Sequence, residues 1–170
     1  YLNSNADTDP AKGFQQSPLS CVNPAHWYVN DNALTNDVYT LGLGDDLNQG
    51  TKRRPFRTIS KAVTTVQTTT SPVPGPNNNT IFVDAGMYNE QVVVPNTISN
   101  LLIKGVGPCN AIAPALTTMV DFTGTVMGKP TLFDIAGNGT VIDGIHFKVD
   151  LSKLNSAIIA TDASLDNITI

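Results

Sequence analysis

The fold is decided by GTKRRPFRTISKAV (50–63), TIFVDAGMYNEQVVVP (80–95) and ISNLLIKGVG (98–107). In the first segment, Pro55 suits a first helical turn, and apolar residues recur at helical spacing from Phe56 to Val66. This predicts an amphipathic helix over about 55–67. The other two segments hold short β-branched and aliphatic runs between turn residues, which predicts strands.

The same strand pattern continues along the rest of the chain in sets of three. The first set is 81–85, 91–94 and 101–105, the second is 118–122, 131–135 and 141–147, and a partial third is 157–161 and 167–170. Matching members are Val92 with Leu132 and Ile158, and Leu101 with Val141 and Asn167. They recur after about 40 and then about 26 residues, which predicts an all-β parallel solenoid whose first coil the helix covers.

Upstream of the helix the sequence predicts two further strands, at HWYVND (26–31) and at Asp37 to Leu41. Residues 1–24 are polar, contain three prolines and show no periodicity, so we expect an extended leader. Residues 25–170 form the cap and first coils, and because the chain stops within an apparent strand we expect the solenoid to continue beyond 170.

Three other architectures compete with a solenoid. A Rossmann-type sheet or a TIM barrel needs a helix in each crossover, and the runs after residue 80 leave no room for one. A β-sandwich also has short, evenly spaced strands and is the serious competitor. The match between successive strand triplets favours the solenoid.

These residues also carry a family resemblance. GxxxxPFRTISKAV, IFVDAGMYNEQVVV and LLIKGVG resemble the opening of right-handed parallel β-helix proteins of the pectin-lyase-like superfamily. WYVNDNALTNDVYTLGLGDDLNQGT (27–51) resembles the start of β-helix regions in large secreted surface proteins of Bacteroidota. The resemblance implies a right-handed parallel β-helix with an N-terminal capping helix, a scaffold that enzymes and non-enzymes share.

Composition narrows the classes of function. The chain has 170 residues, 14% of them charged, and a formal net charge of -4, which suits one domain and gives no basic face for nucleic acid. No apolar run is long enough to span a bilayer, and Tyr1 does not open a signal peptide. We expect a secreted or cell-surface protein whose signal has been removed.

Cys21 and Cys109 lie in no metal-binding spacing pattern. A disulfide between them would tie the N-terminal segment to the body of the fold and fit an oxidising compartment. The alternative is two separate buried thiols.

An oxygen-rich region before the helix could hold a hard cation such as Ca²⁺; it contains Asp31, Asp37, Asp45 and Asp46, with Asn30, Asn32 and Asn48. Of these, the candidate ligands are Asp31, Asp45 and Asp46. Their spacing is not that of an EF-hand loop, and Asn and Asp turns explain much of the pattern without metal. No other cofactor is predicted.

No catalytic residue is assigned. In VDAGMYNEQ (83–91), a phrase also found in pectin methylesterases, we interpret Gly86 as a bend, Tyr88 as a packing residue and Glu90 as an anchor for backbone at the next strand. Four aspartates, Asp121, Asp134, Asp143 and Asp150, lie on or beside strands, where capping backbone amides is the usual role. The alternative is a cluster of carboxylates such as a polysaccharide lyase or hydrolase uses.

Two functions remain open. The first is a non-catalytic surface module, adhesin-like or filamentous, that binds polysaccharide or other surface proteins and could join a fibre or larger assembly. The second is a polysaccharide lyase or glycoside hydrolase whose active site lies on later coils.

Overall fold

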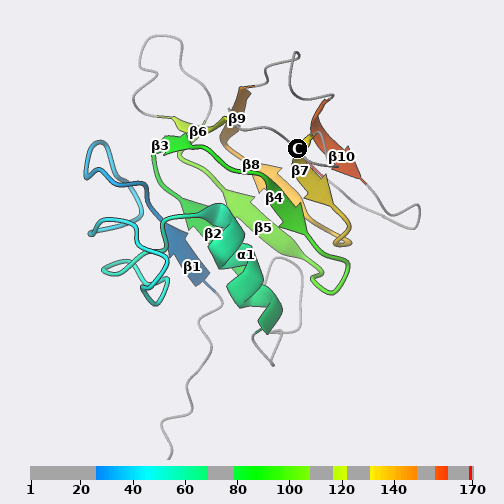
Figure 1. Ribbon diagram of the computed structural model, residues 1–170, viewed down its shortest axis with the longest axis horizontal. Coiled ribbons are helices and arrows are strands. Elements are labelled where there is room, and N and C mark those ends of the chain that lie inside the picture. Colours follow the sequence, from blue (N-terminus) through cyan, green and yellow to red (C-terminus); the bar gives the residue numbers. More distant parts are fainter. Residues whose placement is uncertain are drawn as a thin grey trace, which may run out of the picture.

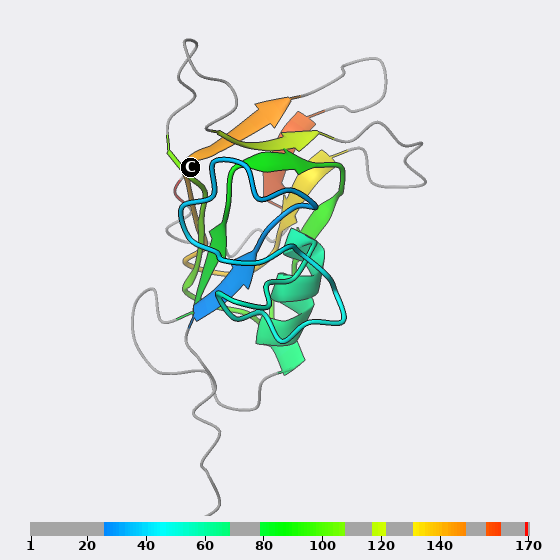
Figure 2. The same ribbon diagram turned by 90° about the vertical axis from the view of Figure 1, so that its left-hand side faces the viewer.

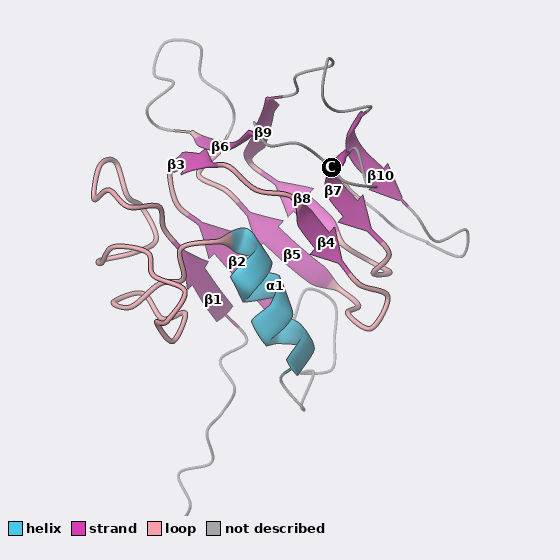
Figure 3. Cartoon of the chain, viewed as in Figure 1, coloured by secondary structure: helices cyan, strands magenta, loops and turns pink. Residues whose placement is uncertain are grey.

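The computed structural model describes residues 26–68, 79–107, 117–121, 131–148, 156–160 and 169. These residues form one helix and ten short strands (Figures 1 and 3). In chain order they are β1 (His26–Val29), α1 (Ile59–Thr68), β2 (Asn79–Val83), β3 (Gly86–Tyr88), β4 (Val92–Val94), β5 (Leu101–Lys104), β6 (Thr118–Asp121), β7 (Thr131–Ile135), β8 (Val141–Asp143), β9 (Ile145–Lys148) and β10 (Ser156–Ala160).

The strands form three sheets, in the orders β1-β2-β5-β8, β3-β6-β9 and β4-β7-β10. From β2 onward the chain visits the three sheets in the same order on each pass, and all the paired strands run parallel. Figure 2 looks from the β1 side, with later strands stacked behind. The prediction of a mostly β protein with parallel pairing is confirmed, and parallel pairing argues against the β-sandwich.

The strand register corrects part of the predicted stacking. The first members of the two predicted sets, 81–85 and 118–122, do not stack, because β2 pairs with β1 and β5 whereas β6 pairs with β3 and β9. Val92 pairs with Phe133, one residue beyond the predicted Leu132. Phe133 in turn pairs with Ile158, as the predicted third member requires.

The third predicted row is also displaced. Val141 pairs with Leu102 on one side and forms a single bridge to Thr169 on the other, in place of Leu101 and Asn167. Although the paired residues differ, β7 still pairs with β4 and β10, and β8 still pairs with β5. The prediction of which strand segments lie side by side therefore holds for these strands.

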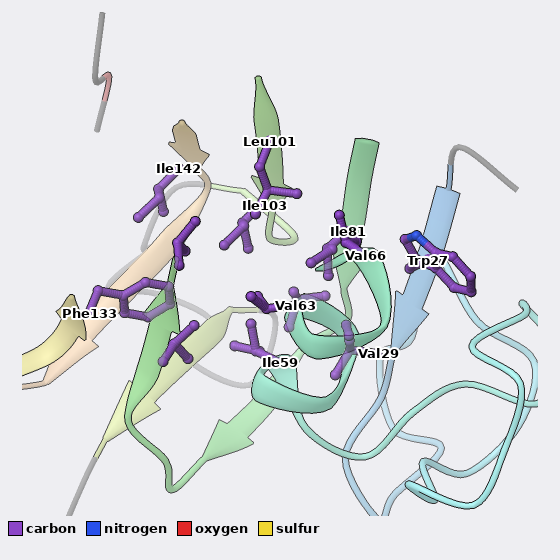
Figure 4. Close-up of a cluster of buried hydrophobic side chains, with 14 of the residues drawn as sticks. Trp27, Val29, Ile59, Val63, Val66, Ile81, Leu101, Ile103, Phe133 and Ile142 are labelled. Atoms are coloured by element: carbon purple, nitrogen blue, oxygen red, sulfur yellow. The ribbon is translucent and has the colours of Figure 1, made fainter. Parts of the chain in front are cut away.

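The hydrophobic core lies inside the three sheets. Alternate residues of β1, β2 and β5 point inward, so that Trp27, Ile81 and Ile103 are buried at matching register positions. Figure 4 shows these side chains facing the buried stripe of α1 and Phe133 of β7. Full burial of such a side chain contributes about 1.5 to 3 kcal/mol, so the shared core holds the sheets to one another.

Helix α1 begins later than predicted. Phe56 pairs with Val29 in a parallel bridge and exchanges backbone hydrogen bonds with Tyr28 and Asn30, so residues 55–57 extend the sheet edge before the helix starts. Thr58 is the N-cap, and its hydroxyl accepts the Lys61 N–H at 3.1 Å.

The buried stripe of α1 is Ile59, Ala62, Val63 and Val66. The helix lies against β1, β2 and β4 (Figure 1), so it covers residues of two sheets. The predicted amphipathic helix is therefore present, with its apolar face on the strands that follow.

The prediction of a second strand, at Asp37 to Leu41, is wrong. Residues 30–50 form an irregular loop between β1 and the segment leading to α1. The amides of Val38, Tyr39 and Thr40 donate to the side chain of Asp84 instead of to a neighbouring strand. A ladder cannot form where a side chain takes its donors.

Candidate functional site

Asp84 holds the loop between β1 and α1. Its side chain is fully buried, and its carboxylate accepts N–H groups from Val38 at 2.6 Å, Tyr39 at 2.9 Å and Thr40 at 2.7 Å. Hydrogen bonds from amides to a charged acceptor are stronger than neutral ones. The hydroxyl of Tyr88 donates to the Asp84 carbonyl at 3.1 Å, which ties the same point to β3.

Glu90 stabilises the N-terminus of α1. Its carboxylate accepts the N–H groups of Ile59 at 2.8 Å and Ser60 at 2.9 Å, together with the Ser60 hydroxyl at 2.6 Å. A carboxylate here complements the free amides and the positive end of the helix dipole. Glu90 thus anchors backbone as expected, but that of α1 and not of the next strand.

Burial raises the pKa of Glu90, and the hydrogen bonds from Ser60 and Ile59 act in the opposite direction. The acid form is favoured by desolvation, while the charged form keeps its three donors. The position of Glu90 at the N-terminus of α1 therefore determines both influences on its pKa, the burial and the hydrogen bonds.

The predicted metal ligands each hold a backbone amide. Asp31 accepts the Ala33 N–H at 2.7 Å, and Asp45 accepts the Leu47 N–H at 2.9 Å. Asp46 accepts the amides of residues 57 and 58 at 2.9 and 3.0 Å. Within the described ranges, no three His, Cys, Asp or Glu side chains come close enough to hold a metal ion. Calcium binding by Asp31, Asp45 and Asp46 stays a prediction.

Cys21 and Cys109 both lie outside the described residues. The disulfide between them therefore stays a prediction too.

A cavity of about 290 Å³ opens between the first loop, the start of α1 and β3. Its lining includes Asp31, Arg57 and Glu90, charges of both signs, beside Asn32, Thr58, Met87, Tyr88 and Asn89. Gly86 borders this region, and a Cβ there would lie 2.5 Å from a carboxylate oxygen of Asp31. The expected bend at Gly86 is thus also a point of close approach.

The outer surface of β1 and β2 carries a group of aromatic side chains that the sequence interpretation missed. We call His26, Tyr28, Tyr39 and Phe82 the aromatic face. Tyr28 stacks on Phe82 with ring centroids 5.3 Å apart and planes at 15°. Tyr39 lies 5.0 Å from Phe82, and His26 meets it edge-on at 5.5 Å. Such pairs stabilise one another beyond simple burial.

Polar groups border the aromatic face. Lys52 places its Nζ 5.5 Å from the centroid of the Tyr28 ring, a cation–π contact. Lys104, paired with Phe82 in the register of β2 and β5, forms a 3.1 Å ion pair with Asp143. The Tyr39 hydroxyl donates to the carbonyl of Gly105 at 3.0 Å. The result is a ring-lined patch with charged groups at its edge.

Burial raises the pKa of both Tyr28 and Tyr39. Both phenols therefore stay neutral at physiological pH and can donate or accept hydrogen bonds. The signal that could have revealed this face is the outward position of Tyr28 and Phe82 in two strands that pair residue for residue.

The aspartates of later strands hold neighbouring groups. Asp121 lies 3.0 Å from the Lys148 ammonium, and Asp143 pairs with Lys104. Asp134 is buried within β7. His146 lies on β9, where it is half-buried and paired with Met119.

Comparison with known proteins gives two matches. The family described as "Protein of unknown function (DUF1565)" matches residues 43–95. The "Probable pectinesterase/pectinesterase inhibitor 6" of Arabidopsis thaliana is 26% identical over 144 residues, which is 84% of this chain and 25% of that protein. The chain thus spans about a quarter of this curated relative.

No solved structure matches the chain. The two sequence matches agree with the resemblance of this chain to pectin-lyase-like β-helix proteins. Among the described elements, there is no helix with the length and apolar character needed to cross a membrane.

Proposed function

We propose that this chain is a non-catalytic β-helix module of a secreted or cell-surface protein, and that it binds a glycan on the aromatic face. In this proposal the three parallel sheets are a right-handed solenoid and α1 is its N-terminal cap. The order of strands and the family matches support that reading. The module could serve an adhesin or a filament.

The aromatic face is the observation that carries the proposal. Pyranose rings present C–H groups that pack on the electron-rich faces of aromatic rings, while their hydroxyls need polar neighbours. Tyr28 and Phe82 offer stacked rings, and Lys52 and Asp143 offer charged groups at the border. His26 and Lys52 are exposed, so the border is open to a ligand.

The environments of the carboxylates support a non-catalytic role. General acid and base catalysis needs carboxylates free to exchange protons with a substrate. Asp84 and Asp46 bind loop and helix amides, and Glu90 accepts three donors from α1. These acids are already used to hold the fold.

Calorimetric titration of the 170-residue chain with a panel of soluble neutral and acidic polysaccharides tests the proposal. We expect at least one to bind, and Tyr28→Ala to weaken it by about threefold to tenfold, as loss of an aromatic contact of 0.5 to 1.5 kcal/mol predicts. Tyr28→Phe should keep most of the affinity. Val93→Ala, an exposed position of β4 in another sheet, is the matched control.

Failure of every glycan to bind would overturn the proposal. So would equal affinity of the wild type and Tyr28→Ala. Circular dichroism of each variant checks that the fold is intact.

A second candidate is a carbohydrate-active enzyme, a polysaccharide lyase or glycoside hydrolase, with its active site on residues other than those described. The relative named as a probable pectinesterase favours a carbohydrate substrate in this broader class. Release of reducing ends, unsaturated uronate or methanol from pectin would favour the enzyme over the binding module.

A further inference from the structure

Three buried oxygen atoms without hydrogen-bond partners occur within the loop that follows β1. They are Oδ1 of Asn30, Oδ1 of Asp37 and Oγ1 of Thr40. Buried polar atoms almost always have a partner, so an unsatisfied atom points to a missing water or ion. All three oxygens lie within eleven consecutive residues.

The geometry points to a hard cation, with Ca²⁺ the best match, bound by the side-chain oxygens of Asn30, Asp37 and Thr40. The site lies in the loop that also carries Tyr39 of the aromatic face, but its three ligands are not residues of that face.

Hydrogen bonds place Asn30 and Asp37 in contact. Nδ2 of Asn30 donates to Oδ2 of Asp37 at 2.8 Å, and it also lies 2.9 Å from the carbonyl of Gly42 and 3.3 Å from that of Ala33. Flipping the amide would set an oxygen against three acceptors, so the nitrogen must stay where it is. Oδ1 of Asn30 is therefore left as a free acceptor in a fully buried side chain.

Asp84 brings Thr40 to the same region. Its own N–H donates to the carbonyl of Val29, the residue before Asn30, and its Oδ2 accepts the Thr40 amide at 2.7 Å. Thr40 is buried, so its hydroxyl oxygen has little access to bulk water. The loop thus folds back on the end of β1.

The local charge favours a cation. Asp37 lies within electrostatic reach of Asp84 and Asp31, and burial, aided by these two negative charges, raises the pKa of its carboxyl against the effect of the Asn30 hydrogen bond. A bound cation would satisfy the three oxygens and reduce this repulsion together. Carboxylate, amide and hydroxyl oxygens without nitrogen or sulfur suit Ca²⁺ and not Zn²⁺.

Asn30 and Asp37 belong to the oxygen-rich region predicted from sequence, but this donor set differs from the candidate ligands Asp31, Asp45 and Asp46. It uses one carboxylate and two neutral oxygens, and waters would complete the coordination of six to eight oxygens that Ca²⁺ prefers.

Thermal unfolding and calorimetric titration of the 170-residue chain test the site, in EDTA and in rising CaCl₂. We expect a saturable rise of the melting temperature by several degrees, since a ligand that binds only the folded state stabilises it. Asp37→Asn keeps the side-chain shape but removes the charge, and should weaken Ca²⁺ binding by about tenfold or more, which is about 1.4 kcal/mol per factor of ten.

Asp45→Asn is the matched control, because Asp45 is exposed and an asparagine can still accept the Leu47 amide. It should bind Ca²⁺ like the wild type. In EDTA, Asp37→Asn should be at least as stable as the wild type, because it loses repulsion from Asp31 and Asp84. That result would separate loss of a ligand from loss of the fold.

The site is overturned if the wild type shows no response to Ca²⁺, or if Asp45→Asn loses the response while Asp37→Asn keeps it. It is also overturned if acidification alone stabilises the wild type and Ca²⁺ does not. A proton shared between Asp37 and Asn30 would then satisfy the two oxygens.

Discussion

Asp84 connects two parts of the chain that lie more than forty residues apart. Its carboxylate serves the three consecutive amides of Val38, Tyr39 and Thr40, and its carbonyl accepts the hydroxyls of Tyr88 and Thr118. A buried carboxylate is costly unless it is bonded in this way. The loop and the charge therefore stabilise each other.

We predict that Asp84→Asn lowers the free energy of unfolding by about 2 to 4 kcal/mol, because an amide nitrogen would face N–H donors and leave them unsatisfied. Urea unfolding measures the loss. Asp143→Asn, which breaks only the exposed pair with Lys104, should cost less than about 1 kcal/mol. Equal losses in the two variants would contradict the role assigned to Asp84.

Single residues were the least predictable part of the molecule. The sequence shows that Asp31, Asp45 and Asp46 lie near one another along the chain, but each one binds a different backbone amide. Asp84 lies in the motif VDAGMYNEQ, but its role was not predictable because the amides that it binds come from a distant loop. Tyr88 and Gly86 were interpreted correctly, since a buried aromatic and a glycine at a close approach depend on local structure.

Helix α1 shows how an element depends on groups outside it. Thr58 is its N-cap, and Glu90, from the segment between β3 and β4, accepts its first two amides. Asp46, from the loop before the helix, accepts the Thr58 amide and so fixes the N-cap residue. An isolated helix of ten residues is marginal in water. Packing and these borrowed acceptors make it stable here.

The raised pKa of Glu90 predicts a pH dependence. A carboxyl whose pKa is higher in the folded state contributes stability that is complete below its ordinary value of 4.5 and is lost as the pH rises through the raised folded value. Glu90→Gln removes this titration. Relative to Glu90→Gln, the wild type should therefore lose stability as the pH rises from 4.5 through the folded pKa.

Urea unfolding of both proteins from pH 4 to pH 8 measures that difference. A difference that stays constant, or that grows in favour of the wild type with rising pH, would contradict the assignment. The hydrogen bonds lost in Glu90→Gln shift the whole curve and leave its slope to report on the titration.

Elements were predicted well where a local pattern specified them. Strands β4, β5, β6, β7 and β10 lie within one or two residues of the predicted runs, and the apolar stripe of α1 fits its helical spacing. The predicted single strand at 141–147 is wrong, because the chain turns there and forms β8 and β9 in two different sheets. The start of α1 was misplaced because Pro55 also suits the extended segment beside β1. The strand expected at Asp37 to Leu41 is a loop because its amides bind Asp84.

At the scale of the whole molecule, parallel stacking sets which strands are held on both edges. Both edges are paired in four strands, which are β2, β5, β6 and β7. We predict that amide hydrogen exchange is slowest in these four strands and faster in the loop 30–50. Exchange measured by mass spectrometry on peptides from the native chain checks this.

Faster exchange in β5 than in the loop would contradict the sheet order. Ile103→Ala, in the centre of the first sheet, should raise exchange in β2 and β8 as well as in β5, since neighbouring strands share the core.

The architecture was predictable as a class, whereas the assignment of strands to sheets was not. Apolar runs in the sequence indicate where strands occur, but they do not indicate which sheet each strand joins. Two residues separate β2 from β3, while a long segment separates β5 from β6, so spacing along the chain misled the pairing of 81–85 with 118–122. Contacts across the core decide the register.

The parallel pairing of β1, β2, β5 and β8 sets a regular spacing of strands along this sheet. Neighbouring strands in a sheet lie about 4.8 Å apart, so the connections that leave the ends of successive strands start at steps of that size. The short connection from β2 to β3 and the long one from β5 to β6 start from neighbouring strands of this sheet. Connections of different length are therefore compatible with one strand spacing, because backbone pairing within the sheet sets that spacing.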